Sequence, residues 1–137
     1  MFKKHRMSFV QKIFWIICGL CLVEEASYGQ EEKFKALFIY NFTKYIQWPA
    51  NIEGDFKIAV IGSNDMVNEL NVIASKKTVG QNTISVVSAN SASSVKQCQI
   101  AFISRKNMDQ LAELVEMAKH SNILIITESS KSCQQGA

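Results

Sequence analysis

The chain has 137 residues, which suits one domain and argues against two. Apolar residues make up 47% of it and Pro49 is the single proline, a composition typical of a packed globular domain and not of a disordered chain. The chain has 15 Lys and Arg residues and 12 Asp and Glu residues. Four of these basic residues and two of these acidic residues lie within the first 29 positions. Residues 30–137 therefore carry 11 basic residues and 10 acidic residues. A nearly neutral chain without a run of basic residues argues against nucleic-acid binding.

Residues 1–29 have the three-part pattern of a secretory signal peptide. A basic start precedes Ile13–Val23, an unbroken apolar run of 11 residues, and small residues follow. Such a run spans roughly 16 Å as a helix, about half of a membrane's hydrocarbon core, so it is too short for a stable anchor. A lipoprotein signal is a weaker alternative, because large apolar residues precede Cys18 and Cys21. We expect cleavage near Gly29 and an exported mature protein without stable membrane insertion.

Residues 31–48 are expected to form an amphipathic helix that precedes the rest of the fold. Apolar side chains recur at steps of three and four and make one broad stripe: Phe34, Leu37, Phe38, Phe42, Tyr45 and Ile46. Pro49 ends the helix, because the residue before a proline is driven out of helical geometry. We expect the three phenylalanines of the stripe to be buried in the core.

From residue 56 onward, apolar runs that are typical of strands alternate with helices or loops. Strands are expected at Phe56–Ile61, Thr83–Val87, Ile100–Ile103 and Ile123–Ile126, and helices at Met66–Ser75 and Met108–Lys119, with a polar connection at Lys76–Asn82. The strands are continuous apolar runs, which indicates that both faces of the sheet are covered. This order predicts one α/β domain over residues 30–137, with a mostly parallel sheet, helices on both faces and the amphipathic helix before it.

The residue types that catalysis needs are sparse. His120 is the only histidine after residue 29, and one histidine with two cysteines cannot complete a zinc site of the usual spacing without carboxylates. The loop after Ile61 has one glycine where nucleotide-binding loops have three. We therefore expect no enzymatic activity, no metal and no cofactor. Open parallel sheets do bind ligands beyond the carboxyl ends of their strands, so Ser63, Asn64 and Ser104 are candidates for a small-ligand site.

Two cysteines, Cys98 and Cys133, follow the signal peptide, an even number in a compartment that permits disulfides. Cys98 directly precedes one expected strand and Cys133 follows the next, so the tail after Glu128 would have to turn back for the sulfurs to meet. The sequence leaves open a bond within the chain, a bond between two chains, and the loss of a partner through truncation.

The segment Lys35–Pro49, KALFIYNFTKYIQWP, resembles the opening helix of the YfiR-like family of periplasmic proteins. Its K-A-x-x-x-Y-N-F-x-K-Y/F-x-x-W-P pattern is long and specific, and Phe56–Gly62, Cys98–Ile103 and Ile123–Glu128 resemble the family in order and spacing. The resemblance implies an exported α/β protein without enzymatic activity. It also implies a repressor that holds the periplasmic sensor domain of a membrane-bound diguanylate cyclase, or acts on a sensor kinase, and that responds to the redox state of the cell envelope.

One departure from the family pattern lies at the C-terminal end. The family continues past Gly136 with a further strand and a helix, whereas Ser129–Ala137 is a polar tail. A sheet of four short parallel strands would also have open edges. We therefore expect the sequence to be a fragment of a longer domain.

These observations predict a regulator that binds the periplasmic part of an inner-membrane signalling protein. Tyr40, Lys44 and Trp48 are the candidate contact residues, expected at the surface of the first helix or at its edge, because aromatic residues dominate many interfaces. The alternatives are a small-ligand carrier or small enzyme on an α/β scaffold, and a structural component of the envelope. The sequence does not predict the oligomeric state.

Overall fold

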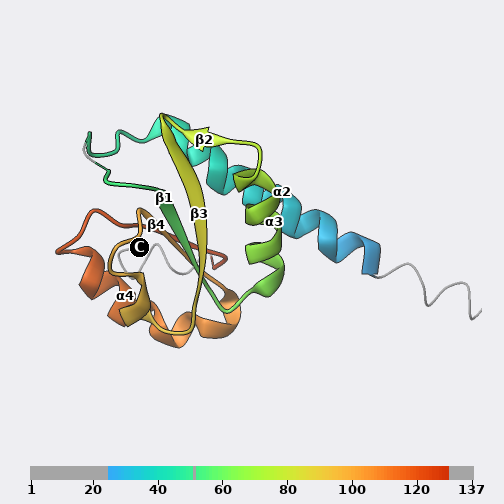
Figure 1. Ribbon diagram of the computed structural model, residues 1–137. Helices are drawn as coiled ribbons and strands as arrows, with labels where there is room; N and C mark the ends of the chain where they lie inside the picture. The colour runs from blue at the N-terminus through green and yellow to red at the C-terminus, as the bar shows by residue number, and fades with distance from the viewer. Residues whose placement is uncertain (1–24, 51, 130–137) are drawn as a thin grey trace, which may run out of the picture. The chain divides into compact units, whose positions relative to one another are not determined.

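A computed structural model describes residues 25–50 and 52–129 of the chain (Figure 1). Residues 1–24, which hold most of the expected signal peptide, and residues 130–137, which hold Cys133, lie outside the described part. The chain divides into two compact units, residues 1–31 and residues 32–137. The described part of the first unit is the start of helix α2, which runs over Glu25–Tyr45, and all other described elements belong to the second unit.

The second unit is built on a five-stranded sheet in the order β2-β3-β1-β4-β5. The strands are β1 (Phe56–Ile61), β2 (Thr78–Val79), β3 (Asn82–Ala89), β4 (Ile100–Ile103) and β5 (Leu124–Thr127). β1 lies at the centre and pairs in parallel with β3 and β4, and β4 pairs in parallel with β5. The short β2 is antiparallel to β3. The expected α/β fold with a mostly parallel sheet is confirmed.

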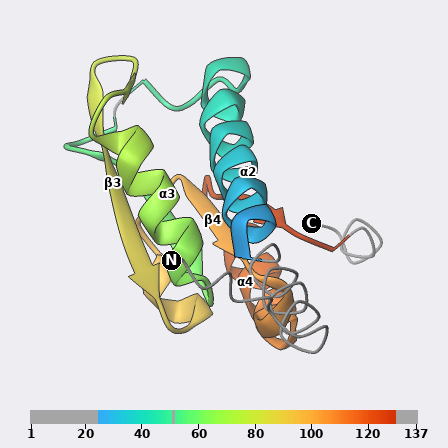
Figure 2. The same cartoon turned by 90° about the vertical axis from the view of Figure 1, so that its right-hand side faces the viewer.

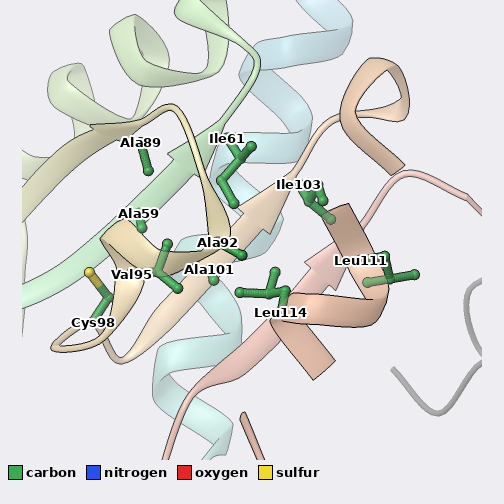
Figure 3. Packing of buried hydrophobic residues seen from close by; sticks show 10 residues of the cluster. All are labelled: Ala59, Ile61, Ala89, Ala92, Val95, Cys98, Ala101, Ile103, Leu111 and Leu114. Atoms are coloured by element: carbon green, nitrogen blue, oxygen red, sulfur yellow. The ribbon is translucent and has the colours of Figure 1, made fainter. Parts of the chain in front are cut away.

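Side chains alternate along the strands and build a core on each face of the sheet. On one face, Ile58 and Val60 of β1 pack with α2 and with α3 (Asn64–Ala74), two helices that lie side by side in Figure 2. On the other face, Ala59 and Ile61 pack with the 3-10 turn η1 (Ala92–Val95) and with α4 (Leu111–Ala118), as Figure 3 shows. The expected helices on both faces are therefore present.

Some element boundaries differ from the expected ones. The connection at residues 76–82 contains β2, which pairs with the start of β3 across a turn at Gly80. Gly80 has a φ of +59°, in the left-handed region that glycine adopts without steric cost. The helix expected from Met108 begins as the 3-10 segment η2 (Arg105–Gln110) and becomes α-helical at Leu111, after a kink at Asn107.

The face of α2 that packs on the sheet is not the one expected from the sequence. Phe34, Phe38 and Phe42 are 61%, 65% and 45% exposed, so the prediction that they are buried in the core is wrong. The buried side chains lie on the other side of the helix: Glu32, Ala36, Ile39, Tyr40 and Thr43. Small residues such as Ala36 and Thr43 let the helix backbone approach the sheet closely, which a row of phenylalanines would prevent.

Candidate functional site

The candidate contact residues of α2 lie in different environments. Tyr40 is 8% exposed, so its expected place at the surface is wrong. Lys44 is exposed, and its ammonium lies 4.7 Å from the centre of the Tyr40 ring, in cation–π geometry. Lys44 Nζ also lies 3.5 Å from Asn41 Oδ1, to which it donates a long hydrogen bond. The buried tyrosine therefore supports an exposed cation that a partner can contact.

Trp48 is half-buried and fastens the end of α2 to the sheet. Its indole Nε1 donates a hydrogen bond to the carbonyl oxygen of Thr43 at 3.0 Å, one of the carbonyls that the last turn of a helix leaves without a helical partner. The indole ring meets the ring of Phe56 edge to face, with centres 4.9 Å apart. These contacts explain why α2 ends at Tyr45, before the expected Trp48, and they give this tryptophan a structural role.

A row of large apolar side chains along α2 is exposed to solvent. The row comprises Phe34, Leu37, Phe38, Phe42 and Tyr45, and we call it the aromatic face. Leu37 is 47% and Tyr45 86% exposed, so the row stays accessible from one end to the other. A contiguous exposed apolar patch on a soluble domain usually marks an interaction site. The sequence showed the spacing of these residues but not that they point to solvent.

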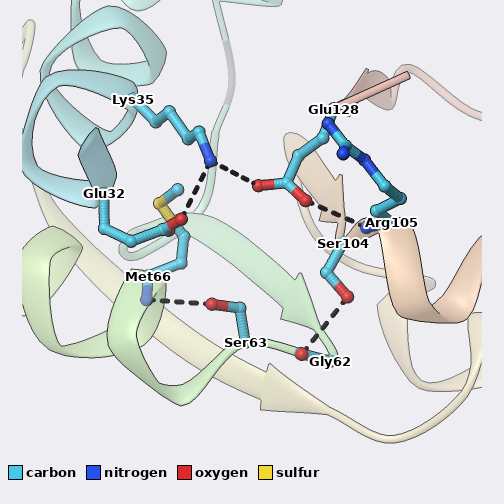
Figure 4. A network of polar contacts seen from close by, with 8 residues as sticks. All are labelled: Glu32, Lys35, Gly62, Ser63, Met66, Ser104, Arg105 and Glu128. Carbon is cyan, nitrogen blue, oxygen red and sulfur yellow. Dashed lines mark hydrogen bonds and ion pairs between the residues drawn. The ribbon is translucent and has the colours of Figure 1, made fainter. Parts of the chain in front are cut away.

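The loops that follow β1 and β4 meet at the carboxyl edge of the sheet (Figure 4). The chain leaves β1 toward one face and β4 toward the other, and ligands often bind between two such strands. Here the Ser63 hydroxyl accepts a hydrogen bond from Met66 N at 3.2 Å and caps α3. Ser104 is buried, and its hydroxyl donates to the carbonyl oxygen of Gly62 at 3.2 Å. Both hydroxyls are engaged within the fold, whereas Asn64 is exposed.

Asn107 fills the space between these two loops. A Cβ atom on Gly62 would lie 1.8 Å from Asn107 Oδ1 and 2.6 Å from Ser104 Oγ, and Gly62 has a φ of +83°. Glycine is therefore required at this position on both steric and conformational grounds. Ser104 Oγ also lies 3.2 Å from Asn107 Oδ1, so its single proton is shared between two acceptors. This packing favours a structural role for the candidate ligand loops.

An ion-pair network ties α2 to the same edge of the sheet (Figure 4). Lys35 Nζ donates to Glu32 Oε1 at 2.9 Å and to Glu128 Oε1 at 2.8 Å, and the second oxygen of Glu128 accepts from Arg105 N at 3.0 Å. Burial by itself raises the pKa of Glu128, but the hydrogen bonds from Lys35 and Arg105 and the charges of these two residues together outweigh it and hold that pKa below its usual value. No pattern in the sequence indicates the contact between Lys35 and Glu128, because these two residues are 93 positions apart along the chain.

A cavity of about 330 Å³ opens at the opposite edge, beside the amino ends of β4 and β5. Its lining comes from three segments: Pro49, Ile52 and Glu53; Lys96, Gln97, Cys98 and Gln99; and Ser121, Asn122 and Ile123. Cys98 is 6% exposed. Burial raises the pKa of its thiol, and the charge of Lys57 offsets this only in part. The volume is at the lower end of the range for small-ligand sites.

The protein-family model described as YfiR/HmsC-like matches residues 32–137. The chain belongs to this family. The resemblance carried by Lys35–Pro49 is therefore confirmed. No curated protein and no solved structure matches the chain.

In this YfiR/HmsC-like domain, much of the Lys35–Pro49 motif serves the packing of α2. Ala36 and Tyr40 face the sheet, Lys35 enters the ion-pair network, and Trp48 closes the helix. Within the described part of the YfiR/HmsC-like domain, no three His, Cys, Asp or Glu side chains lie close enough to hold a metal ion. None of its described helices combines the length and apolarity needed to cross a membrane. Since Cys133 lies outside the described residues, its pairing with Cys98 stays a prediction.

Proposed function

We propose that this chain is an exported, non-enzymatic regulator that binds the periplasmic part of an inner-membrane signalling protein and represses it. Membership of the YfiR/HmsC-like family, over residues 32–137, is the observation that carries the proposal. The partner is a diguanylate cyclase or a sensor kinase, and the repression responds to the redox state of the envelope. Among the described residues, the exposed charges and apolar groups of α2 support a role in protein contact.

Lys44 is the contact residue that we propose for this partner. Its ammonium is exposed, and the buried ring of Tyr40 holds it in place. A cation at the edge of an interface steers an acidic partner surface and contributes to specificity. Tyr40 and Trp48 belong to the same region, but they act through the position of α2 because both pack within the fold.

The test is capture of the partner from envelope extracts by the exported protein and by two charge-reversed variants. Lys44→Glu is expected to weaken capture about tenfold and to raise cyclase or kinase output in cells. Lys33→Glu is the matched control, because Lys33 is exposed on the same helix. Circular dichroism should be unchanged for both variants. The proposal fails if deletion of the gene leaves the output of both kinds of signalling protein unchanged.

A periplasmic small-ligand carrier is the second candidate function. The cavity beside Cys98 favours it, because its volume of about 330 Å³ suits a small molecule. Native mass spectrometry of the exported protein would reveal a bound molecule at a one-to-one ratio. A bound molecule lost in a variant with a filled cavity, such as Asn122→Trp, would favour the carrier, whereas an empty protein with normal repression would favour the regulator.

A further inference from the structure

The charges of the domain are not spread evenly over its surface. Exposed or partly exposed lysines gather at the amino edge of the sheet, where β1, β4 and β5 begin and where the helices end: Lys44, Lys57, Lys76, Lys77, Lys96 and Lys119. Figures 1 and 2 both show the ends of α2 and α3 at the same end of the domain. We call these six lysines the basic edge.

Acidic side chains lie instead at the carboxyl edge of the sheet. Asp65, Asp109 and Glu128 follow the ends of β1, β4 and β5, respectively. Arg105 and Lys106 are the cations that lie among them. The nearly equal numbers of acidic and basic residues in the chain therefore conceal a separation of charge between the two edges.

Three carboxylates lie among the lysines of the basic edge but do not balance them. Glu53 and Asp55 are exposed in the loop before β1. Glu116 accepts a hydrogen bond from Lys119 Nζ at 2.7 Å, so this one lysine is paired within α4 and its cap. The six lysines outnumber these carboxylates, and the basic edge keeps an excess of positive charge.

The type of cation at the basic edge indicates what it binds. All six are lysines, whereas Arg105, the only arginine after the signal peptide, lies at the carboxyl edge. Interfaces between proteins are rich in arginine and poor in lysine, because the guanidinium makes bonds of fixed geometry and the ammonium stays strongly hydrated. A membrane surface with anionic headgroups attracts lysines without fixed geometry, and each lysine adds to the binding.

The distribution of these lysines suits a flat surface. The ends of α2 and α3 contribute three of them on one face of the sheet, β1 contributes one, and the C-caps of η1 and α4 contribute two on the other face. The charges therefore extend across every layer of the domain at one end. A bilayer can meet all these layers at once.

We propose that the basic edge docks the domain reversibly on a bilayer surface that carries anionic phospholipid headgroups. The same surface repels the acids of the carboxyl edge, so the domain stands with that edge away from the membrane. Tyr45, which is 86% exposed in the last turn of α2, lies at the docked end, and tyrosine is enriched where membranes meet water. This inference does not depend on the proposed regulatory function.

The test is sedimentation of the exported protein with vesicles of phosphatidylethanolamine and phosphatidylglycerol, beside uncharged vesicles of phosphatidylcholine. The protein should sediment with the anionic vesicles alone and should be released at about 0.5 M salt, where charges are screened within a few ångströms. The double variant Lys76→Gln, Lys77→Gln should bind roughly twenty-fivefold more weakly, because each lysine near an anionic surface contributes about fivefold.

The double variant Arg105→Gln, Lys106→Gln is the matched control. It removes the same charge from exposed neighbours at the carboxyl edge, so it should leave vesicle binding nearly unchanged. Circular dichroism should be native for both double variants. The proposal is overturned if the unaltered protein ignores anionic vesicles at low salt, if it binds uncharged vesicles equally well, or if both double variants weaken binding equally.

A further arm separates lipid from an acidic protein surface. It compares capture of proteins from detergent-solubilised envelopes, which contain no bilayer, by the unaltered protein and by Lys76→Gln, Lys77→Gln. Equal capture by the two, together with the loss of vesicle binding, supports docking on lipid. If vesicles are not bound and the variant captures less of one protein, the occupant is that protein and the proposal is overturned.

Discussion

Glu128 joins three elements of the domain through one carboxylate. It follows β5, accepts a hydrogen bond from Lys35 of α2, and accepts a second from the backbone of Arg105 at the start of η2. Its side chain is 15% exposed, so water screens these interactions only weakly. The pair therefore differs from the exposed pair of Glu116 and Lys119 on α4, where both side chains are more than half exposed and the contribution to stability is small.

Replacement of Glu128 by Gln is expected to lower the free energy of unfolding at neutral pH by about 1–3 kcal/mol, because charged hydrogen bonds are lost. The pKa of Glu128 in the folded protein is below its unfolded value of 4.5. Its contribution is therefore complete above pH 4.5 and is lost as pH falls through the folded pKa. Urea unfolding at several pH values should show a shallower acid dependence for Glu128→Gln than for the unaltered protein.

Glu116→Gln is the control for this measurement, because Glu116 also has a lowered pKa, through the hydrogen bond and then the charge of Lys119, but its side chain is 65% exposed. It should leave the free energy of unfolding nearly unchanged at neutral pH. Equal losses in the two variants would show that burial of the Glu128 network has no influence on its strength.

At the scale of the elements, the strands were the predictable part. Runs such as Ile100–Ile103 are short, apolar throughout and flanked by polar residues, and this pattern is typical of a buried strand. The two-residue β2 could not be predicted, since it exists only because Thr78 and Val79 pair with the start of β3. Boundaries such as the end of α2 depend on contacts that periodicity does not show, here the hydrogen bond from Trp48 to Thr43 and the ring contact of Trp48 with Phe56 of the sheet.

Helix α2 shows where periodicity alone misleads. The stripe of phenylalanines is the more hydrophobic side, yet the side with Ala36, Ile39 and Thr43 packs on the sheet. Both sides satisfy a helical pattern, and the choice depends on how closely the helix can approach its neighbours. The family motif contains Ala36 and Tyr40 but not Ile39, so it marks the packing side only in part.

Paired truncations on α2 test the assignment of its two sides. Ile39→Ala is expected to lower the free energy of unfolding by about 2–5 kcal/mol, because Ile39 is 1% exposed and its loss leaves a cavity. Phe38→Ala should cost less than about 1 kcal/mol, because most of that side chain is already in water. Chemical denaturation of the two variants and of the unaltered protein measures both losses. A larger loss of stability for Phe38→Ala than for Ile39→Ala would mean that the phenylalanine side of α2 is the buried one, as the sequence led us to expect.

At the scale of the whole molecule, the sequence predicted a mostly parallel sheet but not the strand order. β1 is central because the connection through α3 leads to β3 on one side of it, and the connection from β3 through η1 crosses the other face of the sheet to β4 on the other side. This arrangement brings Lys35 and Glu128, 93 residues apart, into contact at the carboxyl edge. It also places Cys98 and the cavity at the amino edge, away from the hydroxyl groups of Ser63 and Ser104 that were the candidate ligand residues.

The position of Cys98 constrains how the molecule could respond to redox conditions. Cys98 packs with Ala59, Val95 and Ala101 in the core between η1 and the sheet (Figure 3). The thiolate is the reactive form, and burial raises the thiol pKa above its usual value of 9.0. Cys98 lines the cavity at the amino edge, but the residue is only 6% exposed, so we expect its oxidation to be fast only when the segment around η1 opens locally, which would couple oxidation to a conformational change.

This coupling is testable in the variant Cys133→Ser, which leaves Cys98 as the only cysteine after residue 29. With Ellman's reagent, the native variant should react roughly a hundredfold more slowly than the same variant in concentrated guanidinium chloride, because both burial and the raised pKa suppress the thiolate. The native rate should keep rising through pH 9, since the thiol ionises above 9.0. Mass spectrometry of the unaltered protein, purified without reductant from the cell envelope, then tests whether Cys98 pairs with Cys133. A native rate equal to the unfolded rate would mean that Cys98 is directly accessible and that oxidation needs no opening of the domain.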